Sequence, residues 1–498
     1  MSGETTGETT GTLRRDAIGL REVLFQSITA MAPAAAVAAS IPSGAAFAGG
    51  SLPLSVLIAL VACLFTASCV AELARELPAA GSVATYAAQG LHPAVGFLVG
   101  WGYVFVEALV PPLLLLQLGF TTAGTLHQEW SSYPADLWWP WSLAGAAVIA
   151  AAGYLGVRAS ARFGTVLGVF EVLVFLVFAV WLIGKAGSHN TLSVFGTSHT
   201  PKGHEGVSGV FAGSVYTVLA FAGFEAAAPL AEETREPRRT MHRAVLGAAL
   251  GIGLFYVVTT YAMTVYFGPD RFAAFGASGG ASWDGVARAS FGLFWVLVFL
   301  AVVNSTIANA NACANVSTRT AFALARIRVL PRFLAVLHPR YRSPVAGIAV
   351  QTVVAVGAVL GLGFGYDPVT AFLLLATVIV TVVVGVYIVV NLACAGYFLR
   401  RGRESFKVVR HLLLPLLGIG AFVPALLTAA GLPVFDFVSE LTPPVSYAGP
   451  VVGVWMAAGV VVLVVLMRRH PDRIADTARV HIEEPASTGP VRNGVAPR

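Results

Sequence analysis

Long uncharged runs of apolar residues constrain this chain more than any other feature of its sequence. Residues 343–366, 368–399 and 441–467 contain no Asp, Glu, Lys or Arg. A helix needs about 20 apolar residues to cross the hydrocarbon core of a bilayer. Only 11% of the 498 residues are charged, whereas about 25% is typical of soluble domains. The runs do not alternate as the strands of membrane barrels do, so the sequence predicts an all-α polytopic membrane protein.

Twelve apolar segments can be delimited, and we expect each to be a transmembrane helix. The polar segments 1–22 and 468–498 are expected to be disordered cytosolic tails. The predicted spans are 24–47, 53–74, 93–118, 140–157, 163–184, 207–231, 243–267, 290–324, 344–364, 368–399, 411–432 and 447–467.

The basic residues predict the orientation of these spans. With both termini in the cytosol, every Lys and Arg except Lys185, Lys202, Arg271 and Arg288 lies on the cytosolic side. Cytosolic loops of membrane proteins are enriched in these residues. We therefore expect a multi-pass protein of the cell (inner) membrane with cytosolic termini. The net charge of +6 reflects these loops and does not indicate a nucleic-acid partner.

Two spans contain residues that interrupt helices. Pro33 lies in the first span and Gly223 in the sixth, where Glu225 follows it. Proline removes a backbone donor, and freed backbone groups inside a bilayer are tolerated where they are buried or line a cavity. A simple kink is one interpretation of each feature alone. Broken helices at matching positions of two inverted halves instead indicate a transporter's binding site.

Several motifs resemble those of the amino acid–polyamine–organocation (APC) superfamily, in its amino acid permease branch. The sixth span carries the most specific match. The similar stretches are 220–225 with 231–239, 71–82 with 100–101, 156–162, and 317–319 with 323–326 and 330–331.

The resemblance implies a five-plus-five inverted repeat (LeuT-like) with two additional C-terminal helices. The first repeat would cover 23–185, the second 207–400, and the additional helices 410–467. It also implies transport of amino acids by alternating access, with the substrate at the breaks of helices one and six. Pro33 departs from the family, which commonly has a glycine-rich turn at the first break, and this leaves the substrate's identity open.

A broken helix offers complements to both charged groups of an amino acid. Free amides at a helix N-terminus suit a carboxylate, and freed carbonyls in the sixth span suit an ammonium. Phe221 is a candidate gate, with ordinary packing as the alternative, and two aromatic residues of the third span are candidates for the pocket wall. The predicted substrate-binding residues are Met31, Ala32, Pro33, Ala34, Ala35, Ala36, Trp101, Tyr103, Leu219, Ala220, Phe221, Ala222 and Gly223.

Glu107, Glu171 and Glu225 lie deep in predicted spans, where ionisable residues are costly and often functional. By resemblance, Glu171 stands where several proton-coupled relatives have a lysine, and we predict that it couples transport to protons; the alternative is a structural acid that stays protonated or hydrogen-bonded. Glu107 is a second candidate for that role, and Glu225 is interpreted as a structural acid. Dense polar residues in the eighth span are either packing contacts or a cation site. The candidate cation or gate residues are Ser305, Asn309 and Tyr387.

These features predict a secondary active transporter of amino acids, coupled to protons, with a small-molecule substrate and lipid as its partners. Alternatives are a polyamine or amine carrier, an exchanger, an uncoupled channel and a transporter-like sensor. An enzyme is not expected, because phosphate loops and metal-ligand spacings are missing from the sequence. We expect no metal and no cofactor, and the four cysteines read as inert apolar residues.

Overall fold

The computed structural model describes residues 19–474, apart from gaps at 78–81, 156–160, 227, 229–233, 235–236, 277–280, 327–330, 339–340, 342, 436–437 and 470–473. Most of the predicted tails, and parts of the motifs at 71–82, 156–162, 231–239 and 323–331, lie outside the described residues; α1 begins within the predicted N-terminal tail and α18 ends within the C-terminal one. Helices make up the regular structure of the described part. The first half contains α1 (Leu20–Ala30), α2 (Pro33–Ala35), α3 (Ile41–Ser43), α4 (Ala45–Ala48), α5 (Leu52–Glu76), α6 (Ser82–Gly90), α7 (Pro93–Glu129), α8 (Trp139–Leu155) and α9 (Ala161–Ala186). The second half contains α10 (Val207–Phe221), α11 (Pro237–Phe267), α12 (Phe272–Gly276), α13 (Ala281–Phe291), α14 (Phe294–Arg326), α15 (Val345–Tyr366), α16 (Pro368–Arg400), α17 (Leu414–Ala429) and α18 (Ala448–Arg469).

Ten helical segments among the described residues are long and apolar enough to cross a membrane. One of them, Val23–Glu76, has 54 residues, more than twice the length that one crossing needs, and it contains two of the predicted spans. A shorter apolar helix, Trp139–Leu155, coincides with a third. The all-helical membrane architecture is confirmed, whereas the count of twelve spans and the inverted repeat remain predictions.

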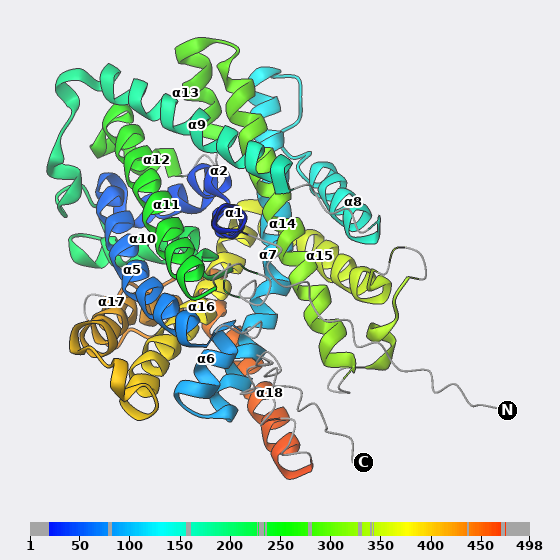
Figure 1. Ribbon diagram of the computed structural model, residues 1–498. Coiled ribbons are helices and arrows are strands. Elements are labelled where there is room, and N and C mark those ends of the chain that lie inside the picture. The colour runs from blue at the N-terminus through cyan, green and yellow to red at the C-terminus, as the bar shows by residue number, and fades with distance from the viewer. Residues whose placement is uncertain are drawn as a thin grey trace, which may run out of the picture.

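Buried and exposed apolar residues are distributed as a bilayer requires. The central helix α16 is largely buried along its length, and it packs against α5, α6, α7, α10 and α17. Figure 1 shows α8 and α15 on one flank of the molecule and α17 on the opposite flank. Large apolar side chains remain exposed on outer helices, such as Val353 at 71% and Val454 at 73%. These faces are suited to contact with lipid.

The first predicted break is present in the structure. Helix α1 ends at Ala30, and α2 begins at Pro33. Between them Ala32 adopts a left-handed conformation with φ of 45°, which is costly for a residue with a side chain. Proline is favourable at the first position of a helix, since its missing donor is not needed there. The chain therefore stops one helix and starts the next without losing a further hydrogen bond.

A π-helical segment follows directly. Residues Ala36–Ser40 form π-type bonds, which reach one residue further along the chain than those of an α-helix. The side chain of Gln117 on α7 donates to the Ala35 carbonyl at 2.8 Å. The first span is thus irregular over two consecutive turns, and a side chain of a neighbouring helix bonds to its backbone.

The second predicted break ends α10. This helix stops at Phe221, Ala222 is extended with ψ of 128°, and Gly223 has φ of +111°. A Cβ atom at Gly223 would lie 2.7 Å from the carbonyl oxygen of Ala30. Position 223 therefore requires glycine for two reasons: the backbone conformation and the close approach of the two broken helices. The two interruptions meet inside the molecule.

Candidate substrate site

A cavity of about 100 Å³ opens between the two breaks. The first break contributes Met31, Ala32, Ala35 and Ala36, and the second contributes Leu219, Ala222, Gly223 and Glu225. Helix α7 adds Tyr103, Glu107 and Gln117, and α14 adds Asn309 and Cys313. Most of its remaining described lining is apolar, which is the usual composition of a small-molecule site with a few placed polar groups.

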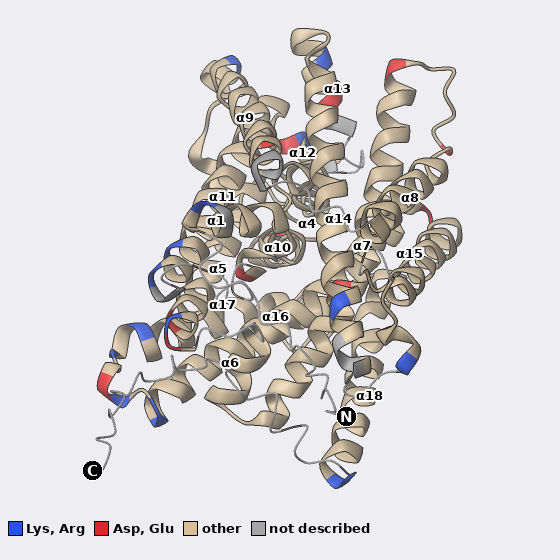
Figure 2. Cartoon of the chain, turned by 45° about the vertical axis from the view of Figure 1, so that its right-hand side comes forward, with Lys and Arg blue, Asp and Glu red and all other residues tan. Residues whose placement is uncertain are grey.

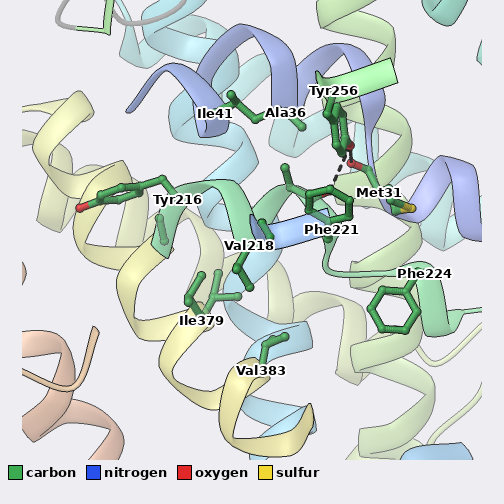
Figure 3. Packing of buried hydrophobic residues seen from close by; sticks show 14 of the residues in the cluster. Met31, Ala36, Ile41, Tyr216, Val218, Phe221, Phe224, Tyr256, Ile379 and Val383 are labelled. Carbon is green, nitrogen blue, oxygen red and sulfur yellow. Dashed lines mark hydrogen bonds between the residues drawn. The ribbon is translucent and has the colours of Figure 1, made fainter. Parts of the chain in front are cut away.

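Tyr256 on α11 fastens both breaks to one another. Its hydroxyl lies 2.8 Å from the carbonyl oxygen of Met31 and 3.0 Å from that of Ala220. One hydroxyl proton is shared between two carbonyls from different broken helices. Figure 3 shows Tyr256 beside Met31, with the ring of Phe221 next to it. A second cross-link is the Ser27 hydroxyl, which donates to the Phe224 carbonyl at 2.8 Å.

Among the acids of the site, Glu225 receives the most hydrogen bonds from described residues. The hydroxyl of Tyr103 donates to its Oε1 at 3.0 Å, and the hydroxyl of Tyr387 donates to its Oε2 at 2.9 Å. The amide of Gly223 also donates to Oε2, at 3.2 Å. Three donors around one carboxylate stabilise its ionised form. The sequence placed these three side chains in separate roles, and the structure joins them into one cluster.

Glu107 lines the same cavity from α7, but fewer hydrogen-bond donors surround its carboxyl group than surround that of Glu225. Its Oε2 is buried and lacks a hydrogen-bond partner among the described residues. The thiol of Cys313 lies beside its carboxyl group. A buried carboxylate oxygen without a partner is costly, so Glu107 Oε2 has capacity for a ligand. Glu107 and Glu225 are close enough to influence one another electrostatically.

Glu171 lies behind the first break and not among the described residues that line the cavity. Its carboxyl is buried, close to the Ser305 hydroxyl on α14 and the Ala34 amide of α2. Even so, Glu171 Oε2 and Ser305 Oγ have no well-formed hydrogen bond within the described part of the chain. The structure therefore brings the predicted coupling acid together with one predicted cation ligand and with the broken helix.

Some predicted site residues lie elsewhere. Trp101 packs against α18, where its ring stacks on Trp455 at 4.9 Å and each indole donates to the other's backbone carbonyl. Phe221 is fully buried with its ring edge-on to Tyr256. Neither is among the described cavity residues, and Pro33, Ala34 and Ala220 also lie outside that lining.

Some of the backbone amides and carbonyls that were predicted to bind the substrate already form hydrogen bonds within the protein. The Ala36 amide donates to the Ala32 carbonyl at 2.8 Å, and the Leu219 carbonyl accepts from the Ala222 amide at 3.1 Å. The Ala220 carbonyl accepts from Tyr256. In this conformation the side chains of Glu225 and Glu107 offer more to an ammonium than those carbonyls do.

Sequence reasoning did not identify Tyr256, Gln117 or Cys313 as parts of the site. Tyr256 and Gln117 are polar residues within otherwise apolar spans, which is the signal that would have drawn attention to them. Cys313 gave no signal, because buried cysteines commonly act as small apolar residues.

Comparison with known proteins identifies the family. The amino acid permease family matches residues 22–468. The Low-affinity putrescine importer PlaP of Escherichia coli is 28% identical, over 74% of this chain and 79% of its own length. An uncharacterized transporter of Mycobacterium tuberculosis is 31% identical, over 68% of this chain and 73% of its own. The Branched-chain amino acid permease BcaP of Bacillus subtilis is 25% identical, over 61% and 65%. The chain belongs to the amino acid permease family and is a membrane transporter, not an enzyme.

Proposed function

We propose that this protein carries amino acids or related small amines by alternating access around the cavity between the broken helices. In this proposal the twelve predicted spans form a five-plus-five inverted repeat, extended by α17 and α18. The termini lie in the cytosol of a cell whose inner membrane holds the protein. The ammonium group common to amino acids and amines is what the site recognises.

The main support for this proposal is that the charged residues in the described lining of the cavity are acids. Glu225 and Glu107 both line it, and its described lining contains no Lys, Arg or His. Two buried acids without a cationic partner favour a cationic ligand, since a charge removed from water needs an opposite charge. We place the ammonium next to Glu225, whose tyrosine and amide donors fix the carboxylate's position.

A ligand with two ammonium groups is a second candidate. Glu107 provides the specific support, because it gives the cavity a second acid whose Oε2 has no partner among the described residues. Both alternatives have a counterpart among the relatives. One relative is named as a putrescine importer and another as a branched-chain amino acid permease. An amino acid would instead direct its carboxylate toward the amide end of the first break.

Uptake into proteoliposomes tests both alternatives. Radiolabelled amino acids and diamines are presented to the wild type, Glu225→Gln and Glu107→Gln. Loss of a charged partner from a buried pair costs about 3–5 kcal/mol, so Glu225→Gln should lower binding by more than 100-fold. Glu107→Gln should impair a diamine far more than a monoamine. Saturable uptake that survives Glu225→Gln unchanged would remove the ammonium assignment, and flux without saturation would indicate a channel.

Glu171 supports proton coupling. Its buried carboxyl lies beside Ser305 and the Ala34 amide of α2, and in this proposal a change in its protonation alters that contact and moves α2. Uptake driven by a pH gradient should lose its gradient dependence in Glu171→Gln while exchange of substrate across the membrane persists. If the same acid binds sodium with Ser305 and Asn309, a sodium gradient will drive uptake instead. Gradient-driven uptake equal to that of the wild type would exclude Glu171 from coupling.

A further inference from the structure

A second pocket lies away from the cavity, where the C-terminal end of α5 meets the first turns of α11. It has a volume of about 400 Å³, and its described lining consists of Arg75, Arg239, His242 and Arg243. Helices α5 and α11 pack extensively against one another, so the backbone positions that carry these side chains are held close together. Figure 2 shows Lys and Arg concentrated toward this end of the molecule.

Among the described residues, few ion pairs compensate the charges of this pocket. Arg75 is 3.9 Å from Glu72, but Glu72 also pairs with Arg410 at the shorter distance of 3.2 Å. Within the described part of the chain, Arg239 and Arg243 form no ion pair.

His242 and the N-terminus of α11 also favour an anion in this pocket. The Nδ1 atom of His242 is buried and has no hydrogen-bond partner among the described residues. Arg239 lies in the first turn of α11, where the helix dipole disfavours a cation and favours an anion. Orientation in the membrane requires Lys and Arg on one side, but it does not require three arginines and a histidine to surround one pocket.

We propose that this basic pocket binds a phosphate group. A phosphate oxygen accepts hydrogen bonds from several guanidinium groups at once, and basic pockets between helices at the membrane surface bind anionic headgroups. The phosphate can come from an anionic phospholipid or from a free phosphate in solution. The site is separate from the transport cavity, and the inference does not depend on which substrate is carried.

Binding measurements on the purified full-length protein distinguish the sources. The probes are phosphatidylglycerol against phosphatidylcholine in nanodiscs, followed by native mass spectrometry, and inorganic phosphate in neutral detergent, followed by thermal unfolding. The test variant is Arg239→Gln/Arg243→Gln, and Arg468→Gln/Arg469→Gln is the matched control at the exposed end of α18.

The wild type and the control should retain phosphatidylglycerol in preference to phosphatidylcholine. Because Arg239 and Arg243 would donate directly to the phosphate, the test variant should retain it roughly 30-fold less well. The single variants Arg239→Gln and Arg243→Gln should each lose roughly 5-fold, which preserves the test if the double variant does not fold. A response to inorganic phosphate without a lipid preference supports the pocket with free phosphate as its ligand. Equal responses of the wild type and the test variant to both probes overturn the proposal, as does an equal loss in the control.

Discussion

Replacing Tyr256 by phenylalanine tests how the two broken helices are held together. The change removes only the hydroxyl, which lies 2.8 Å from the Met31 carbonyl and 3.0 Å from the Ala220 carbonyl. The ring keeps its edge-on contact with Phe221 at 5.3 Å. Leaving a buried polar group without its partner costs about 1–3 kcal/mol, whereas hydrogen bonds between membrane helices average about 0.6 kcal/mol. Because two carbonyls lose one shared donor, we expect a loss of about 1–2 kcal/mol in the free energy of unfolding.

Tyr86→Phe is a control of the same residue type. Tyr86 is fully buried on α6, and its hydroxyl has no hydrogen-bond partner among the described residues. Removing it should leave stability unchanged or raise it. Unfolding of both variants is followed in detergent by tryptophan fluorescence, and uptake is measured alongside. If Tyr256→Phe is no less stable than Tyr86→Phe, the hydroxyl does not fasten the breaks, and our account of the site's geometry is refuted.

Two further changes test the second break and the helix α13, which lies outside the candidate spans. Gly223→Ala should lower thermal stability and abolish uptake, because its Cβ would lie 2.7 Å from the Ala30 carbonyl oxygen at a φ of +111°. Gly251→Ala on α11, where nothing lies within 4 Å, should have no such effect, and equal behaviour of the two would contradict the requirement for glycine. Burial raises the pKa of Asp284 from 3.8 to about 7, against the lowering effect of the Thr125 hydroxyl that donates to it at 2.5 Å. The folded state therefore holds a proton that the unfolded state has lost, so wild-type stability should fall as pH rises between those two values. Asp284→Asn should flatten that part of the stability–pH profile, and an unchanged profile would show that another group titrates.

The sequence predicted the fold class and the two breaks for local reasons. In hydrocarbon every backbone polar group needs a partner within the protein, so long apolar runs become helices. Pro33 and Gly223 interrupt those helices through their own backbone properties, whatever surrounds them. The acids Glu107, Glu171 and Glu225 also stand out by themselves, because ionisable residues are rare in such spans.

The roles within the site were much less predictable. Trp101 was expected in the pocket, but its partner on α18 is 354 residues away in the chain. A uniformly apolar span gives little indication of which face turns inward, since lipid and the protein interior accept the same side chains. For the same reason the sequence could not show that Tyr103, Tyr387 and Glu225 form one cluster.

The sequence by itself thus determined that the chain crosses a membrane as helices and where two of them stop, because these outcomes depend on the bilayer and on single residues. Only the tertiary structure decided which freed backbone groups remain available and which are already bound. The Met31 carbonyl is taken by a hydroxyl 225 residues away, and the Ala35 carbonyl by an amide 82 residues away. Such partners are set by how distant helices pack, and local sequence carries no record of that packing.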